Sequence, residues 1–285
     1  MRRAAGTMTM NRTKTSSLLA AASALIFGAL AFAGPASAAS PSGPTPERLK
    51  WSFSGMFGQF DQAQLQRGFF VYREVCQQCH SLSRVAFRNL AEPGGPGFSQ
   101  GQVRALAAEY KIKDINDAGD AIERPGRPAD MFPRIFPNDE AAKYVHGIAP
   151  PDLSVMAKAR SYSRGFPMFL LDMLPGSAYQ EHGVDYIVAL LAKGYTKADD
   201  PKWNAYFPDN VIAMANPLTD GRVEYADGSP KTVEQYSRDV SAFLMWAAEP
   251  KMEERKKTGL MVMLFLLVFA GLLYFTKKKV WADAH

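Results

Sequence analysis

Residues 76–80 read Cys-Gln-Gln-Cys-His, a spacing of thiols and imidazole that can hold a porphyrin. Two thiols on one helical turn can each add to a vinyl group of the same porphyrin, while the adjacent imidazole coordinates the iron. This C-x-x-C-H spacing is the attachment signature of c-type haem. We therefore predict one covalently bound haem c, with Cys76 and Cys79 as thioether anchors and His80 as the proximal iron ligand.

The cysteine content of the chain narrows the alternatives. Cys76 and Cys79 are the only two cysteines among 285 residues, which leaves no thiol for a disulfide framework or a four-thiolate zinc site. A thioredoxin-like redox pair uses the same spacing, but it belongs in a βαβ setting, and no parallel-strand pattern surrounds residue 76. Haem attachment is therefore the favoured interpretation.

A methionine sulfur is the expected ligand on the other face of the iron. An iron held by His80 alone would be open to small ligands, whereas a thioether closes the site and raises the reduction potential. Met214 lies in the segment VIAMANPL, a predicted loop before the last helix of the domain. We predict Met214 as this ligand, with ordinary core packing as the alternative. The other methionines of the predicted domain are Met56, Met131, Met156, Met168, Met173 and Met245.

Histidine could take the place of methionine, but the domain offers few candidates besides His80. His146 precedes a glycine and is predicted to be a turn residue. His182 lies in a polar stretch and is predicted to be solvated. Neither residue shows the neighbours that would orient an iron ligand.

Two helices must position the haem motif. One is predicted to begin at Asp61, in a capping pattern, and to carry apolar residues at helical spacing up to Cys76. The other begins after Thr232 and ends before Pro250, with Met245 and Trp246 expected in its core face. Crossing of two such helices beside the haem is typical of single-haem c-type cytochromes.

The chain between these helices is predicted to hold short helices and long loops. Helical patterns cover residues 99–110, 139–145 and 184–193, and loops rich in Pro and Gly separate them. Residues 161–183 look like an inserted excursion. The predicted fold class is mainly α: a single-haem c-type cytochrome fold with long loops and insertions, plus one C-terminal transmembrane helix.

The N-terminal 38 residues have the composition of a secretory signal. Four basic residues precede an apolar run over residues 18–33, which ends in the small residues Ala-Ser-Ala at 36–38. We predict a signal peptide over residues 1–38, cleaved after Ala38. A membrane anchor is the alternative, since the run is barely long enough to cross a bilayer. Export would place the haem domain, residues 39–257, in a bacterial periplasm.

Residues 258–276 form an uncharged apolar stretch between two clusters of basic residues. At about 1.5 Å per residue, this stretch spans roughly 28 Å, close to the hydrocarbon thickness of a bilayer. A transmembrane helix is predicted here, with a buried core helix as the alternative. Export of the haem domain would leave residues 277–285 as a short cytoplasmic tail, so the protein is expected in the bacterial inner membrane, crossing it once.

The exported part of the chain is slightly acidic, although the whole chain carries a formal charge of +5. Residues 39–250 hold 22 Lys and Arg against 25 Asp and Glu, a formal charge of −3. This balance argues against nucleic acid as a partner and for a docking partner that is neutral or basic.

Beyond the haem motif, an ordered set of segments resembles the cytochrome c1 family, the haem-bearing subunits of ubiquinol:cytochrome c oxidoreductase (bc1) complexes, in its alphaproteobacterial form. The resemblance runs through most of the mature chain. The segments that carry it are RGFFVYREVCQQCHS at 67–81, FRNL at 87–90, PRIFPN at 133–138, PPDLS at 150–154, DY at 185–186, IAM at 212–214, DG at 220–221 and FLMWAAEP at 243–250.

The resemblance implies roles for several residues. It assigns Met214 as the second axial ligand, although Ala215 and Asn216 replace prolines that are usual there. It places Arg160 and Tyr186 where the family holds a haem propionate. It also suggests that a carbonyl of Pro150 or Pro151 orients the His80 ring.

The function that the resemblance implies is electron transfer. The chain would accept electrons from the Rieske iron-sulfur protein and reduce a soluble periplasmic cytochrome c. Its C-terminal helix would pack against cytochrome b and membrane lipid, in a dimeric complex. The chain would be an electron carrier without catalytic residues of its own.

One alternative is a free-standing membrane-anchored cytochrome c that serves an oxidase or a photosynthetic reaction centre. Another is an enzyme such as a peroxidase, which needs an open distal site.

Overall fold

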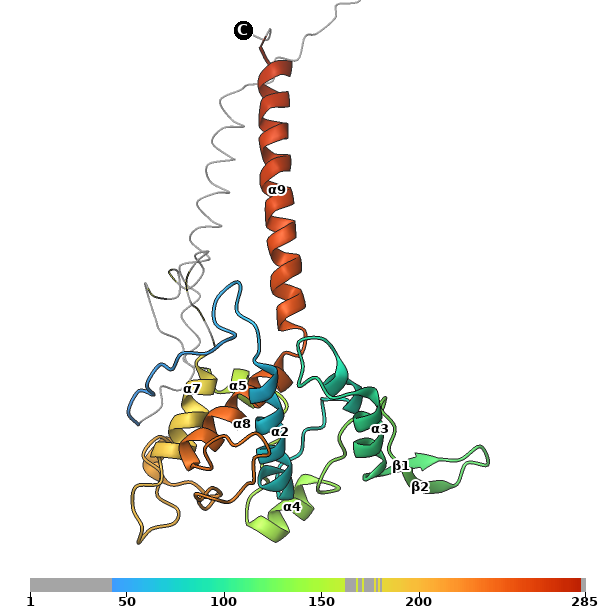
Figure 1. Ribbon diagram of the computed structural model, residues 1–285, viewed down its shortest axis with the longest axis vertical. Helices are drawn as coiled ribbons and strands as arrows, with labels where there is room; N and C mark the ends of the chain where they lie inside the picture. The colour runs from blue at the N-terminus through green and yellow to red at the C-terminus, as the bar shows by residue number, and fades with distance from the viewer. Residues whose placement is uncertain are drawn as a thin grey trace, which may run out of the picture. The chain divides into compact units, whose positions relative to one another are not determined.

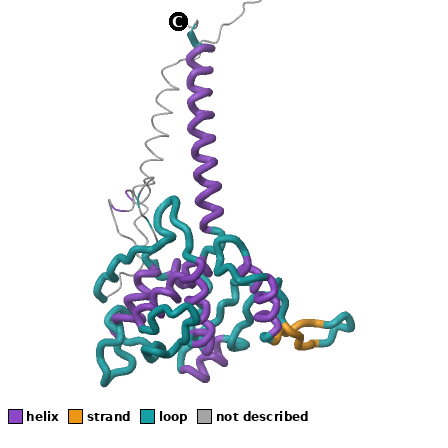
Figure 2. The backbone as a smooth tube through the Cα atoms, in the orientation of Figure 1, coloured by secondary structure: helices purple, strands orange, loops and turns teal. Residues whose placement is uncertain are grey.

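The computed structural model describes residues 43–161 and 181–282, together with Met168, Leu171, Ser177 and Tyr179. The predicted signal peptide, most of the 161–183 excursion, Met173 and the last three residues lie outside the described residues. Figures 1 and 2 show that the described part is mainly helical, with a single two-stranded sheet. The predicted fold class is confirmed.

The predicted helices are present in the expected order, and the structure adds the short elements α5, η2 and η4 and a hairpin. The helices are α2 (Gln62–Glu74), α3 (Gln100–Ala108), α4 (Asp139–His146), α5 (Met156–Ala159), α7 (Gly183–Val188), α8 (Val233–Ala248) and α9 (Met252–Val280). The short turns are η1 (Cys76–Gln78), η2 (Phe87–Ala91), the π-helical η3 (Ala189–Lys193) and η4 (Pro208–Asn210). The hairpin is antiparallel and consists of β1 (Lys111–Ile115) and β2 (Ala121–Pro125), in which Lys111 pairs with Pro125.

Both principal helices begin at the capping residues that the sequence predicted. The Asp61 carboxylate accepts hydrogen bonds from the backbone N–H groups of Ala63 and Gln64, at 2.9 and 3.2 Å. The Thr232 hydroxyl accepts one from the N–H of Gln235 at 3.3 Å. These bonds satisfy donors that have no partner inside a helix, so both predicted helix starts are confirmed.

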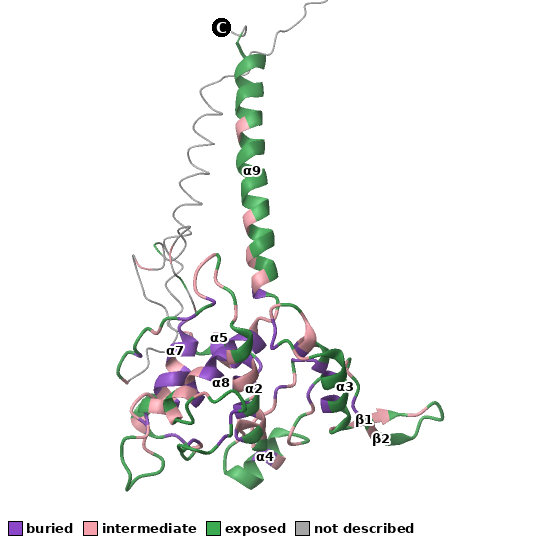
Figure 3. Ribbon diagram, viewed as in Figure 1, coloured by how far each residue is buried: buried purple, intermediate pink, exposed green. Residues whose placement is uncertain are grey.

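Helices α2 and α8 pack closely at Gly68. A Cβ atom added there would lie 2.1 Å from the Asp239 carbonyl oxygen and 2.7 Å from the Phe243 Cβ. Only glycine permits so close an approach of the two backbones. Met245 and Trp246 on α8 are buried, as predicted. Figure 3 shows buried residues concentrated along α8 and on the faces of its neighbours α2 and α7.

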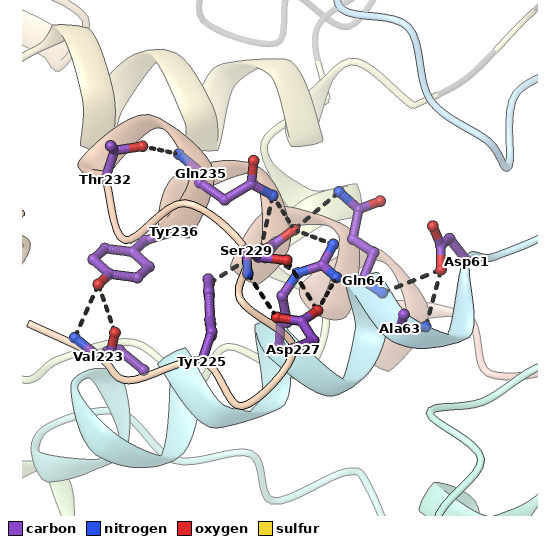
Figure 4. Close-up of polar contacts among 12 residues, drawn as sticks. Asp61, Ala63, Gln64, Val223, Tyr225, Asp227, Ser229, Thr232, Gln235 and Tyr236 are labelled. Atoms are coloured by element: carbon purple, nitrogen blue, oxygen red, sulfur yellow. Dashed lines mark hydrogen bonds and ion pairs between the residues drawn. The ribbon is translucent and has the colours of Figure 1, made fainter. Parts of the chain in front are cut away.

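A polar network joins α2 and α8 (Figure 4). The Arg67 guanidinium donates to Asp239 at 2.9 Å and to Asp227 at 2.8 Å. The Tyr225 hydroxyl donates to the same Asp239 carboxylate at 3.0 Å. Because Asp239 is completely buried, its charge depends on these partners. The network therefore fixes the crossing that carries the haem motif.

Helix α9 is long and apolar enough to cross a membrane. An 18-residue window within it has a mean hydropathy of 2.4, and none of that window is buried inside the protein. The predicted span, residues 258–276, lies inside α9, which begins six residues earlier than this span. Its first turns are bonded to the haem domain, since Glu253 accepts from the N–H of Phe60 at 2.7 Å and Lys256 donates to the Phe53 carbonyl at 2.7 Å.

Candidate haem site

The haem motif forms a tight turn directly after α2. The backbone N–H groups of Cys79 and His80 both donate to the Cys76 carbonyl, at 3.2 and 2.9 Å. This turn brings the two thiols and the imidazole together, as the motif spacing predicted. Both cysteines are free, and Cys76 packs against the main hydrophobic core.

The state of the Cys76 thiol argues against thioredoxin-type chemistry. Burial, together with the neighbouring Cys79, raises the pKa of the Cys76 thiol to about 12. A redox-active C-x-x-C pair depends on a lowered thiol pKa, which stabilises the nucleophilic thiolate. Cys76 is instead a neutral thiol at physiological pH, which suits an anchor better than a redox nucleophile.

The His80 ring is oriented through its Nδ1 atom, which lies 2.7 Å from the Pro151 carbonyl oxygen. Because a carbonyl can only accept, Nδ1 carries the proton, and the lone pair of Nε2 is available to an iron atom. Burial lowers the pKa of His80 despite the bond to Pro151, and nearby His146 lowers it further. The ring is therefore neutral, the state that a metal ligand needs.

The Pro151 carbonyl is itself held by the residue that follows it. The Asp152 carboxylate accepts from the Ser83 N–H at 2.9 Å, from the Ser83 hydroxyl at 2.6 Å and from the Ser154 N–H at 2.8 Å. Burial would raise the pKa of Asp152, but the hydrogen bonds from Ser154 and Ser83 hold it below its usual value. Asp152 thus joins the segment after the haem motif to the segment that orients His80.

Met214 lies in the loop between η4 and α8. It is half-buried and packs against the same hydrophobic core as Cys76 and Tyr186. The Tyr195 hydroxyl donates to the Met214 carbonyl at 2.8 Å, and an antiparallel bridge pairs Val211 with Trp203. In place of a proline, the Asn216 side chain accepts from the Leu218 N–H at 3.2 Å and forms a turn.

Arg160 and Tyr186 come together from two helices that touch. Arg160 ends α5, and Tyr186 lies in α7. The helices meet at Gly183, where an added Cβ would lie 1.8 Å from the Ala157 carbonyl oxygen. Burial raises the pKa of Tyr186, while the Arg160 guanidinium is close enough to act in the opposite direction. An exposed guanidinium beside a half-buried phenol can bind a carboxylate.

The competing candidates have other surroundings. Met245 is a buried core residue, and Met131 is half exposed and pairs with Ala86. His146 was predicted to be a turn residue, but it is the last residue of α4, and the chain turns at Gly147, which has a positive φ.

The expectation of a solvated His182 is wrong. Its side chain is only 3% exposed and lies 3.9 Å from the Asp185 carboxylate. The polar sequence around it suggested surface, but α7 begins beside it and packs it against the domain.

The donor set of this site fits haem c. It consists of two thiols and an imidazole with a free Nε2 on one turn, and a half-buried thioether on a separate loop. Sequence reasoning missed Asp152 and Tyr195 as positioning residues. The bonds of Asp152 to Ser83 and of Tyr195 to Met214 join residues 69 and 19 positions apart, so they form only after folding.

Comparison with known proteins agrees with this chemistry. The family model described as the Cytochrome C1 family matches residues 51–284. Cytochrome c1 of Blastochloris viridis is 48% identical over 268 residues, which cover 90% of this chain and 93% of the relative. Cytochrome c1 of Rhodospirillum rubrum is 42% identical over 257 residues, covering 88% and 92%.

One relative is much longer than this chain. The protein named cytochrome b/c1 from Bradyrhizobium diazoefficiens is 55% identical over 276 residues, covering 94% of this chain. The match covers only 39% of that relative's length.

Proposed function

Because the chain belongs to the cytochrome c1 family, we propose that it is the electron-transfer subunit of a cytochrome bc1 complex. It accepts single electrons from the Rieske iron-sulfur protein and reduces a soluble periplasmic cytochrome c. The observation that carries the proposal is the turn at residues 76–80, with both thiols beside an imidazole that the Pro151 carbonyl orients.

The residues of the site have distinct tasks. Cys76 and Cys79 would anchor haem c, the cofactor of this family, and His80 and Met214 would bind its iron. When bound, this group takes up and releases one electron. Two fixed ligands exclude water and small molecules from the iron, and this favours electron transfer over peroxidase chemistry. Arg160 and Tyr186 hold a propionate group.

The membrane arrangement follows from the two ends of the chain. Residues 1–38 are a cleaved signal peptide, and residues 39–257 form a periplasmic haem domain. The chain crosses the bacterial inner membrane once through α9, and residues 277–285 lie in the cytoplasm. The side chains of α9 between residues 261 and 270 are exposed, which leaves this helix free to pack against cytochrome b and lipid.

The composite name of the Bradyrhizobium relative, cytochrome b/c1, supports cytochrome b as a partner. The complex is a dimer in this proposal, as is expected of the family.

The tethered-shuttle alternative needs a flexible connection between haem domain and membrane. Here, only Glu249, Pro250 and Lys251 separate α8 from α9. Glu253 and Lys256, in the first turns of α9, are hydrogen-bonded to the backbone of residues 53–60. Such a connection favours a fixed subunit of a complex over a mobile carrier.

The assembly can be tested by purifying the full chain in mild detergent through a C-terminal tag. Pyridine haemochrome spectra would then measure covalent c-type and extractable b-type haem. Co-purification of b haem in a fixed ratio to c haem, with an iron-sulfur signal, supports the bc1 complex. A stable preparation that contains c haem alone would contradict it and favour the shuttle.

A further inference from the structure

A cavity of about 670 Å³ lies where α9 leaves the haem domain. Its walls come from three parts of the chain: residues 56–59, residues 93–94 and the start of α9. Apolar side chains and basic side chains both contribute to the lining. The apolar ones are Met56, Phe57, Pro93 and Leu260, and the basic ones are Lys251, Lys256 and Lys257.

The charges of this lining are not balanced. Lys251 is paired with two carboxylates, at 3.1 Å from Glu92 and 3.6 Å from Glu254. Lys256 instead donates to the Phe53 and Gly58 carbonyls, at 2.7 and 3.2 Å. Within the described part of the chain, neither Lys256 nor Lys257 has an ion-pair partner. The cavity therefore has two cationic groups without a paired carboxylate, and Lys256 retains one N–H beyond its two bonds to carbonyls.

The Glu253 carboxylate accepts a hydrogen bond from the N–H of Phe60 at 2.7 Å, and among the described residues it forms no ion pair with Lys256 or Lys257. The lining holds three lysines against the glutamates Glu253 and Glu254, and Glu92, outside the lining, pairs with Lys251. The unpaired cationic groups of Lys256 and Lys257 therefore favour an anionic headgroup over a zwitterionic one.

The position of the cavity along α9 indicates what kind of anion it receives. Lys257 directly precedes the apolar stretch that begins at residue 258, so the cavity lies at the level of lipid headgroups. Leu260 lines the cavity, and Leu264, one turn further along α9, is 55% exposed. The surface thus changes from cationic at the cavity to apolar further along α9, in the direction of the bilayer.

We propose that this cavity binds an anionic phospholipid from the leaflet on the haem-domain side, with its phosphate near Lys256 and Lys257 and its acyl chain along Leu260 and Leu264. This site depends on α9 crossing a membrane and not on the electron-transfer role of the haem. Free inorganic phosphate lacks the acyl chains and binds weakly there.

The test uses the full-length holoprotein in its native complex, reconstituted in phosphatidylcholine nanodiscs. A small fraction of phosphatidylglycerol with a photoreactive headgroup is added, and cross-linked peptides are mapped by mass spectrometry. We expect cross-links to residues 56–59 and 93–94. Lys257→Gln should reduce their yield about fivefold, the effect of losing one ion pair to the lipid phosphate inside the cavity.

Arg255→Gln is the matched control, because Arg255 lies outside the cavity lining and pairs with Glu249. It removes one positive charge at the same membrane surface and should leave the yield unchanged. Excess inorganic phosphate should not compete. Three results would overturn the proposal: equal yields with photoreactive phosphatidylcholine, equal losses in both variants, or cross-links from another polypeptide at residues 56–59.

Discussion

The Tyr195 hydroxyl donates a 2.8 Å hydrogen bond to the Met214 carbonyl oxygen. Burial raises the pKa of Tyr195 to about 12, against a smaller opposite effect of Asn204, so the hydroxyl remains a donor throughout the physiological pH range. The bond ties the loop of the proposed axial ligand to the segment after η3. It holds a loop that continues through Ala215 and Asn216, where the Asn216 side chain accepts from the Leu218 N–H.

We predict that Tyr195→Phe weakens methionine ligation without removing the haem. Loss of one hydrogen bond costs about 1 kcal/mol, which corresponds to a fall of up to about 40 mV in the potential of a one-electron couple. A redox titration and the near-infrared methionine-to-iron absorption band would measure this. Tyr206→Phe is the control, since the Tyr206 hydroxyl has no hydrogen bond among the described residues. Equal potentials in both variants would show that Tyr195 has no positioning role.

Asp152 should stabilise the protein in a pH-dependent way. Its pKa is lowered on folding by the bonds from Ser154 and Ser83, so the stabilisation is present above the unfolded-state value of about 4 and is lost as pH falls below it. Asp152→Ala should lower the free energy of unfolding by about 2–3 kcal/mol at pH 7, with a smaller difference in acid.

Urea denaturation of the holoprotein at several pH values would measure this difference. Asp117→Ala, at an exposed loop position, is the control and should have little effect. If Asp152→Ala lowered the free energy of unfolding by the same amount at every pH, the stabilisation would not depend on the charge of the Asp152 carboxylate.

The crossing of α2 and α8 can be tested at Gly68. Gly68→Ala places a methyl group 2.1 Å from the Asp239 carbonyl, so the helices must separate, and we expect a loss of about 3 kcal/mol or more. The matched change Gly101→Ala also lies in a helix, but its nearest neighbour would be at 3.8 Å. That variant should be neutral or more stable by up to about 1 kcal/mol. Thermal unfolding followed by haem absorbance would compare them, and equal stabilities would contradict a close crossing.

Features determined by nearby residues were predictable from the sequence. The haem turn and the capped starts of α2 and α8 depend on residues within a few positions of one another. The hairpin of β1 and β2 was missed because its strands, KIKDI and AIERP, are mostly exposed and lack a strong apolar alternation. Its turn has a positive φ at Gly119.

Contacts between residues far apart in the chain could not be predicted from local sequence patterns. Asp152 reaches Ser83 across 69 positions, and Tyr195 reaches Met214 across 19. Neither Asp152 nor Tyr195 differs in local sequence from ordinary loop residues. His182 was misjudged for the same reason, because the element that buries it is not visible in its polar neighbours.

Replacing Met214 shows whether His80 and Met214 together bind the haem iron. We would measure the reduction potential and the near-infrared methionine-to-iron band of Met214→Leu, with Met156→Leu as a control at another half-buried methionine of the domain. We predict that Met214→Leu loses the near-infrared band, has a lower reduction potential and binds small ligands at the iron. Met156→Leu should retain the wild-type values. An unchanged band and potential in Met214→Leu would contradict this ligation.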